Sequence, residues 1–317
     1  MTASQIAAQN APAEAKPAVL TSDRRFWIAL SLVTVYIIWG TTYLGIRFAL
    51  ESFPPYLLMG IRFVLAGGGL LLFLRMRGAA MPTLRQWRSA ALVGILLLVF
   101  GMGSVAMAEQ WVSSGLAAML AATVPLWALL FSALWRNYPT RREWIGVLVG
   151  LLGVAILSLE GNLQANPLGM GLILFAMASW AFGSVWMRRL DMPPGAMGNA
   201  AEMLAGGVVL LVVGFLRGEQ ITTQPTTNAL LALAYLTTFG SIATLTAYMY
   251  LLKTVSPALA TSYTFVNPVI ALLLGVVMGG ELLTGSALIA LPVILLGVAF
   301  VLRGKSGSKP TTLKDSN

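Results

Sequence analysis

The sequence contains no cysteine and no histidine among its 317 residues. Without cysteine the chain forms no disulfide and offers no thiolate nucleophile, although this absence does not identify the cellular compartment. Without histidine it lacks the commonest metal ligand and the usual catalytic base at neutral pH. No G-x-x-x-x-G-K-[ST] motif, which would bind the phosphates of a nucleotide, is present either. The sequence therefore does not support a process driven directly by ATP hydrolysis. We therefore expect that the protein binds no metal or cofactor and is not an enzyme.

Charged residues are scarce as well, at 10% of the chain, whereas hydrophobic residues make up 58%. A water-soluble domain rarely reaches such a composition, which indicates a membrane protein. Apolar runs of about 20 residues, the length that crosses about 30 Å of hydrocarbon as a helix, occur at 26–49, 56–74, 87–108, 113–135, 143–160, 168–190, 197–216, 229–252, 258–280 and 285–302. They are too long and too uniformly apolar for barrel strands. The predicted fold class is an all-α polytopic membrane protein with ten transmembrane helices.

Lysine and arginine are distributed unevenly between alternate loops. Apart from Arg47, Arg62 and Arg217, the 20 basic residues fall in the tails and in the loops that share a side with the N-terminus. The positive-inside rule therefore predicts that both termini are cytoplasmic. The first 25 residues do not resemble a signal peptide, because the apolar run that follows is long enough to span. No basic cluster lies outside short loops and tails, so the expected partner is the lipid bilayer and not nucleic acid.

The two halves of the chain match each other at a nearly constant offset. The segment "VSSGLAAMLAATVP" (112–125) corresponds to "VSPALATSYTFVNP" (255–268), and "PPYLLMGIRFVLAGG" (54–68) corresponds to "PPGAMGNAAEMLAGG" (193–207). The sequence therefore predicts a duplicated unit of five helices. The expected organisation is a tail at 1–25, a first repeat at 26–160, a second repeat at 161–303 and a tail at 304–317.

A unit of five helices has consequences for topology. Five is odd, so the second copy enters the membrane from the opposite side, and a pseudo-twofold axis in the membrane plane relates the repeats. Such inverted repeats are typical of alternating-access carriers, whose substrate site lies at the repeat interface near mid-membrane. A duplication that merely doubles a stable bundle remains the alternative.

Several polar and aromatic residues are placed for a cavity at that interface. Positions i, i+4 and i+8 share one helix face, which groups Trp39, Tyr43 and Arg47 in the first repeat and Trp180, Ser184 and Arg188 in the second. Tyr263 and Asn267 are likewise four residues apart. Pro125 and Pro268 lie near the centres of two spans, where each removes a backbone hydrogen bond. We expect helix breaks at both prolines, facing protein or a wet cavity.

The motifs together resemble a known family. The segments "YIIWGTTYLGIRFALESFPP", "AEQWVSSGLAAMLAATVPL", "SWAFGSVWMRRL", "EMLAGGVVLL", "GSIATLTAYMYLLKTVSPALATSYTFVNPVIALLLG" and "GGELLTG" resemble the drug/metabolite transporter superfamily and, more narrowly, its EamA family. The resemblance runs from about residue 26 to 303. It implies a bacterial inner-membrane exporter of small metabolites that has two EamA repeats and works by alternating access. It does not imply a particular substrate.

Two arginines lie well inside the first two apolar runs. A charge at the bilayer centre costs at least about 2.5 to 3.5 kcal/mol on insertion scales, so each needs a partner, water or a function. At a rise of about 1.5 Å per residue, both lie roughly 10 to 12 Å below the turn at Pro54. Arg47 is placed to extend toward the outer interface. Arg62 either faces the cavity, where its guanidinium would hold a substrate carboxylate, or pairs with Glu109.

Two acids also fall within or at the ends of spans. Glu109 ends the third span and is an interfacial residue, an arginine partner or a gate. Glu202 lies about five residues into the seventh span and is the only acid well inside the second repeat. A buried carboxyl of this kind can load and release a proton in a proton-coupled antiporter. The structural alternative is an ion pair between Glu202 and Arg188 or Arg189.

The favoured function is secondary active export of a small polar or amphipathic metabolite, such as an amino acid or a related compound, by alternating access. The tryptophans support one alternative, a multidrug exporter of aromatic cations, but the scarcity of deep acids argues against it. A channel or assembly protein and an intramembrane enzyme are less favoured. The expected partners are a small-molecule substrate and lipid. The sequence leaves a monomer and a dimer equally open.

Overall fold

The computed structural model describes residues 22–112, 114–158, 166–279 and 285–303, and all regular elements in these ranges are helices. The helices of the first half are α2 (Ser22–Leu50), α3 (Pro55–Met76), α4 (Leu84–Gly94), the π-helix η1 (Ile95–Gly103), α5 (Ser104–Ala108), α6 (Ser114–Ala121), α7 (Val124–Ala133) and α8 (Arg141–Ser158). Those of the second half are α9 (Pro167–Trp186), the 3₁₀ helix η2 (Met187–Arg189), α10 (Ala196–Leu216), α11 (Thr227–Tyr235), the π-helix η3 (Leu236–Ala243), α12 (Thr244–Thr254), α13 (Pro257–Thr261), α14 (Tyr263–Gly279) and α15 (Gly285–Leu302).

Six helical stretches within the described residues are long and apolar enough to cross a membrane. They are Asp23–Leu50, Pro55–Met76, Leu84–Ala108, Pro167–Arg189, Ala196–Leu216 and Thr227–Thr254. The run expected at 113–135 is divided between α6 and α7, and the run expected at 258–280 is divided between α13 and α14. Part of the run at 143–160 lies outside the described residues, as do the tail at 304–317 and residues 1–21 of the tail expected at 1–25, whose last four residues belong to α2. The fold is thus an all-helical membrane bundle.

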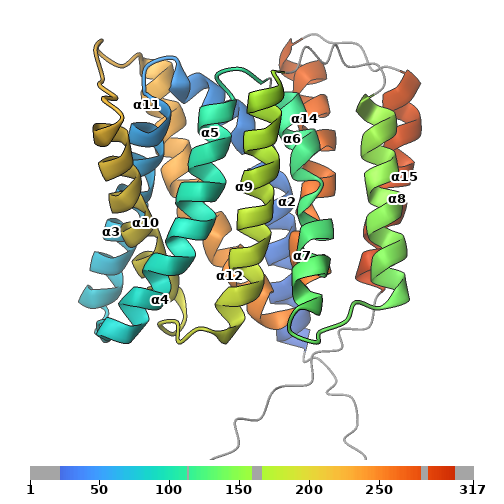
Figure 1. Ribbon diagram of the computed structural model, residues 1–317, viewed down its shortest axis with the longest axis horizontal. Helices are drawn as coiled ribbons and strands as arrows, with labels where there is room; N and C mark the ends of the chain where they lie inside the picture. The colour runs from blue at the N-terminus through green and yellow to red at the C-terminus, as the bar shows by residue number, and fades with distance from the viewer. Residues whose placement is uncertain (1–21, 113, 159–165, 280–284, 304–317) are drawn as a thin grey trace, which may run out of the picture.

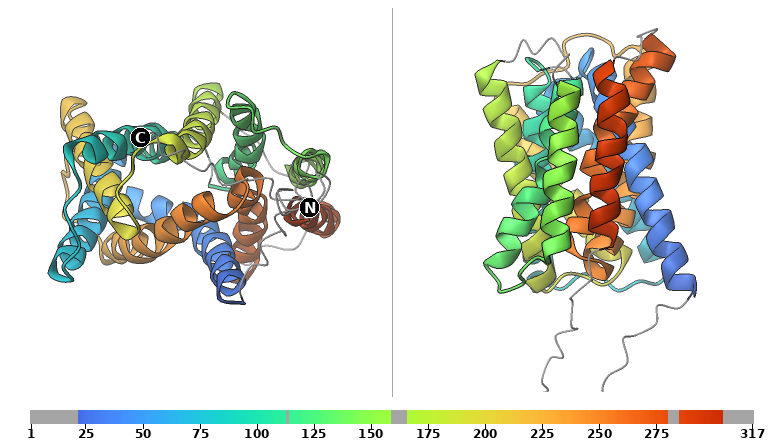
Figure 2. Two further views of the ribbon diagram at one scale, coloured as in Figure 1. Left: turned by 90° about the horizontal axis from the view of Figure 1, so that it is seen from below. Right: turned by 90° about the vertical axis from the view of Figure 1, so that its right-hand side faces the viewer.

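The helices form an elongated bundle with one tight pair at each extremity. α3 and α10 pack together at one extremity, and α8 and α15 pack together at the other (Figures 1 and 2). Between them α2 contacts α12 and α14, while α9 contacts α5 and α7. Figure 1 shows α2 beginning and α15 ending at the same end of the bundle. We call this the inner end and the opposite one the outer end.

Glycines allow the α3–α10 pair to approach at backbone distance. A Cβ added to Gly67 would lie 2.4 Å from the backbone nitrogen of Leu204, and one added to Gly207 would lie 2.7 Å from that of Val64. Small residues are the usual contact points between membrane helices, where hydrophobic burial drives no association and packing does. The pair α8–α15 uses the same device, because a Cβ on Gly146 would lie 2.8 Å from the carbonyl oxygen of Gly297.

We expect Gly207→Val to lower the stability of the bundle by about 2 to 3 kcal/mol, because the added carbons meet α3 backbone that cannot move aside. Gly69→Val is the matched control, since nothing lies within 4 Å of a Cβ at Gly69, and it should change stability by less than about 0.5 kcal/mol. The measurement is thermal unfolding of both variants in one detergent. Equal melting temperatures would contradict the close packing.

Each half contains a π-helical segment inside one long span. η1 joins α4 to α5, and η3 joins α11 to α12, without a break in either span. Inside η3 the Ser241 hydroxyl donates to the carbonyl of Leu236 at 3.0 Å, and the hydroxyl of Thr244, the first residue of α12, donates to that of Phe239 at 2.7 Å. Segments of this kind are rare and are frequent at functional sites. The apolar runs of the sequence gave no sign of them.

Candidate functional site

A small buried cavity lies near the centre of the bundle, between helices of both halves. Its volume is about 40 Å³, which is room for only a few water molecules, so it has to widen before a metabolite fits. It is lined from α2 by Trp39, Thr42, Tyr43 and Ile46, from the third span by Gly101, Met102 and Val105, from the α6–α7 region by Ala121 and Val124, from α9 by Met177 and Trp180, and from α14 by Tyr263, Thr264 and Asn267.

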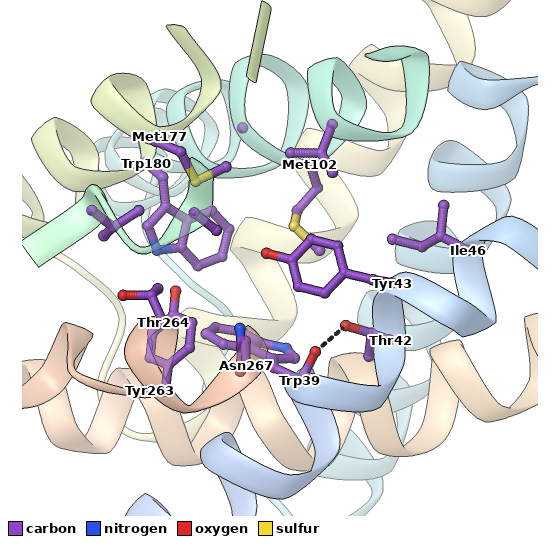
Figure 3. Close-up of a pocket in the computed structure, with 14 residues that line it drawn as sticks. Trp39, Thr42, Tyr43, Ile46, Met102, Met177, Trp180, Tyr263, Thr264 and Asn267 are labelled. Carbon is purple, nitrogen blue, oxygen red and sulfur yellow. Dashed lines mark hydrogen bonds between the residues drawn. The ribbon is translucent and has the colours of Figure 1, made fainter. Parts of the chain in front are cut away.

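Five of the residues that the sequence pattern assigns to a cavity meet here. They are Trp39, Tyr43, Trp180, Tyr263 and Asn267. The side chains of Trp180, Tyr43 and Asn267 point toward one another across the space (Figure 3). The spacing of four residues between Trp39 and Tyr43, and between Tyr263 and Asn267, places both members of each pair on the cavity face of their helix.

An aromatic cluster closes the inner side of the cavity. The ring of Trp39 lies 5.4 Å from that of Trp180 and 4.7 Å from that of Tyr263, centroid to centroid, in edge-to-face arrangements, which are favourable geometries for aromatic pairs. Tyr248 of α12 completes the cluster at 5.0 Å from Trp39. The Trp180 indole donates to the Tyr248 hydroxyl at 3.1 Å, and Ser184 shares a 2.8 Å hydrogen bond with the same hydroxyl.

Ser184 differs from the sequence expectation, whereas the sequence indicates Tyr248 only as one of several aromatics that offer a π-surface. Ser184 does not line the cavity. It is buried one helical turn from Trp180 toward the inner end, and its hydroxyl forms a hydrogen bond with the Tyr248 hydroxyl. Tyr248 is a central member of the cluster, yet the repeat pattern did not select it, because it has no aromatic counterpart in the first half. The available signal was its position in an apolar span, where a tyrosine hydroxyl needs a partner.

Both cavity tryptophans contact the π-helix of the opposite half. The Trp39 indole donates to the Gly240 carbonyl of η3 at 3.1 Å. Trp180 packs on η1, where a Cβ on Gly101 would lie 3.0 Å from its Cε3 atom. Gly101 of η1 and Gly240 of η3 therefore leave space for side chains at the wall of the cavity. The two π-helices hold the indoles of Trp180 and Trp39 in place.

The cavity offers neutral hydrogen-bonding groups and no charge. The amide of Asn267 has neither donor nor acceptor satisfied by the residues that the structure describes, although its side chain is buried. The Thr42 hydroxyl donates to the Trp39 carbonyl at 2.8 Å (Figure 3). Buried amides are normally hydrogen-bonded, so Asn267 is the group most in need of a ligand or water.

Arg62 is fully buried but does not line the cavity in this conformation, which corrects its expected position. Its Nε donates to the Ser241 hydroxyl at 2.7 Å, and its guanidinium carbon lies 4.9 Å from the Phe63 ring centroid. A Cβ on Gly240 would lie 3.0 Å from the free Nη2 of Arg62 and 3.1 Å from Cγ2 of Thr42. Arg62 thus lies behind the cavity wall, against η3.

The acids form none of the ion pairs considered from sequence. Glu109 follows α5 directly, and both of its carboxylate oxygens lack a hydrogen-bond partner among the described residues, so no Arg62–Glu109 pair is formed there. Glu202 is fully buried in α10, also with both oxygens unpartnered. Neither Arg188 nor Arg189 bonds to it; they donate to the carbonyls of Val255 and Trp135.

The two prolines behave differently from each other. Pro125 begins α7, just after the interruption that follows α6. Pro268 lies inside the continuous helix α14, so the break predicted at Pro268 is misplaced. The interruption in that span is at Ser262, between α13 and α14, where the Ser262 hydroxyl bonds to the Tyr36 hydroxyl at 2.7 Å. A membrane helix can run through a proline when neighbours satisfy the freed carbonyl.

Comparison with known proteins places the chain among membrane transporters. The model of the EamA-like transporter family matches residues 26–159 and 167–303. The protein called "Uncharacterized inner membrane transporter YedA" of Escherichia coli (strain K12) is 50% identical over 276 residues, which cover 87% of this chain and 90% of that protein. The "Uncharacterized transporter YdfC" of Bacillus subtilis (strain 168) is 27% identical over 266 residues, 83% of this chain and 87% of that protein.

A solved crystal structure has the same fold. It superposes with a TM-score of 0.73 at 24% sequence identity and covers 86% of this chain and 96% of its own. The family match occurs twice along the chain and extends over most of it, and the relatives at 50% and 27% identity are both called transporters. This chain belongs to the EamA-like transporter family.

Proposed function

We propose that the protein is a secondary active exporter of small metabolites, such as amino acids or related compounds, that works by alternating access in a bacterial inner membrane. The observation that carries this proposal is the central cavity, in which Trp39 and Trp180, at corresponding positions of the two halves, lie 5.4 Å apart. A substrate site built from both repeats at their interface is the arrangement of alternating-access carriers.

The proposed architecture has ten spans in two inverted repeats, 26–160 and 161–303, with both termini cytoplasmic. The helix contacts support it because they are symmetric when the halves are exchanged. α2 contacts α12 and α14, and α9 contacts their counterparts α5 and α7. The positions of η1 and η3 in the third span of each half agree with the same exchange.

The lining of the cavity supports a neutral or zwitterionic amphipathic substrate. Aromatic faces and the side chains of Met102 and Met177 offer an apolar surface, while Asn267, Tyr43 and Thr264 offer hydrogen bonds. An isolated charge would be costly there, because no opposite charge lines the cavity. The aromatic cluster favours the second candidate, an exporter of aromatic cations, but such a substrate would lack a carboxylate partner in this cavity.

We further propose that Glu202 carries the coupling proton. It is fully buried and its carboxylate oxygens have no hydrogen-bond partner among the described residues, and acids inside membrane spans are rare and mark proton relays. Tyr248 connects its surroundings to the cavity, because it contacts Trp39 and Trp180 and its helix α12 packs against α10, which carries Glu202.

The test of export is a comparison of extracellular metabolites from cells that overproduce the protein. A compound that accumulates outside with the native chain should fall at least about tenfold with Asn267→Ala, because the buried amide loses its substrate contact. Asn228→Ala, an exposed asparagine on α11, is the matched control and should export normally. Equal export by both variants at equal membrane abundance would remove the cavity from the proposal.

A further inference from the structure

Two arginines occupy corresponding places at opposite ends of the cavity. On α2, Arg47 lies one turn beyond Tyr43 toward the outer end, on the face that carries Trp39. In the second half, Arg188 lies one turn beyond Ser184 toward the inner end, on the face that carries Trp180. Spacings of four residues keep each set on one helix face. Each arginine therefore lies one turn beyond the matching residue of its helix, and the two lie toward opposite ends of the bundle.

Arg188 is engaged in this conformation. Its guanidinium donates to the carbonyl of Val255, the residue that follows α12. The last carbonyls of a helix have no partner within it and carry partial negative charge, so they attract cations. Arg24 at the start of α2 donates to the adjacent carbonyl of Thr254 at 3.5 Å. Two arginines thus hold α2, η2 and α12 together at the inner exit.

Arg47 is not engaged. Its side chain is exposed, and it forms no hydrogen bond or ion pair with any residue that the structure describes. Its corresponding target is Val112, which lies four residues beyond the end of α5 and begins the segment 112–125, as Val255 begins the matching segment 255–268. Three residues before this target lies Glu109, whose carboxylate oxygens have no partner among the described residues.

We propose that Arg188 and Arg47 are two latches that close the inner and outer exits in turn. In the conformation described here the Arg188 latch is closed and the Arg47 latch is open. In the opposite conformation Arg188 leaves the Val255 carbonyl, and Arg47 binds the turn after α5 at the Val112 carbonyl and the Glu109 carboxylate. This inference rests on the proposed alternating access, and it assigns the residues that bias each conformation.

The size of the effect follows from the chemistry of the bond. Loss of one hydrogen bond from a charged donor shifts an equilibrium by roughly tenfold or more. The two latches stabilise opposite states, so their loss has opposite consequences. Arg188→Gln should populate the inward-open state, and Arg47→Gln should populate the outward-open state. A purely structural arginine would not produce such a reversal.

The test uses the absence of native cysteine. A single Thr42→Cys substitution places a reporter in the cavity wall, and a membrane-impermeant maleimide is added to right-side-out or inside-out vesicles. Relative to the reporter alone, Arg188→Gln should slow labelling from the outer face and accelerate labelling from the inner face, so that the ratio of the inner to the outer labelling rate rises by roughly tenfold. Arg47→Gln should slow labelling from the inner face. Arg77→Gln, an exposed arginine on the inner side, should change neither rate.

Arg188→Lys provides a milder variant that retains the charge and should restore part of the outer labelling. Unchanged rates in Arg188→Gln, or shifts in the same direction for both latches, would overturn the proposal. Labelling requires no transported compound, so its result does not depend on which substrate the protein transports. Opposite shifts without any metabolite export would support the latches and contradict the proposed export. A reporter labelled equally from both faces in every background would contradict alternating access itself.

Discussion

Replacing Glu202 with glutamine is expected to reduce proton-driven export by at least about 100-fold while leaving the binding of substrate and its exchange across the membrane intact. Glutamine has nearly the shape of the protonated acid but cannot release a proton, so coupling to a pH gradient is lost. Binding should persist because Glu202 does not line the cavity. The side chain is fully buried, so the neutral amide also avoids the cost of an unpaired buried charge.

The measurement uses purified protein in liposomes with an imposed pH gradient and the compound identified by export from cells. Net uptake driven by the gradient reports coupling, and counterflow of labelled against unlabelled compound reports binding and alternation. Glu51→Gln is the matched control, because Glu51 is exposed beyond the end of α2, and it should retain both activities. Gradient-driven flux that survives in Glu202→Gln would dismiss Glu202 as the proton carrier.

The sequence was sufficient to predict the helical membrane fold and most of the residues that line the cavity, because both follow from simple helix geometry in lipid. Apolar runs of about 20 residues have one main solution in lipid, the helix. Within a helix, spacing alone decides which side chains share a face. Trp39 and Tyr43 on α2, and Tyr263 and Asn267 on α14, therefore met in the cavity as expected.

The sequence was not sufficient where tertiary partners decide the outcome. The π-helical form of η3 is accompanied by bonds from the Ser241 and Thr244 hydroxyls to carbonyls five residues earlier, and an apolar run contains no signal of that choice. The position of Arg62 depends in turn on Ser241, a residue 179 positions away in the chain. The break at Ser262 in place of Pro268 likewise reflects local hydrogen bonding, including the contact with Tyr36.

Arg62 and Ser241 are expected to be strongly coupled in stability. Ser241→Ala should lower the free energy of unfolding by about 2 kcal/mol, because a fully buried guanidinium loses its Nε acceptor. Arg62→Met should be nearly neutral or stabilising, since a methionine of similar length removes the buried charge altogether. In the Arg62→Met background, Ser241→Ala should then cost less than about 1 kcal/mol, because only the neutral bond from Ser241 to the Leu236 carbonyl is lost.

The double-mutant cycle isolates this coupling because the two side chains are in direct contact at 2.7 Å. Ser132→Ala is the control, a buried serine on α7 whose hydroxyl donates to the Ala128 carbonyl at 2.6 Å, and it should cost the same in both backgrounds. Unfolding in mixed detergent micelles measures all variants under one condition. A coupling energy near zero would mean that Arg62 is compensated by a group other than Ser241. A large coupling with loss of transport in Arg62→Met would instead connect this buried charge, through η3 and the Gly240 carbonyl that holds Trp39, to the cavity.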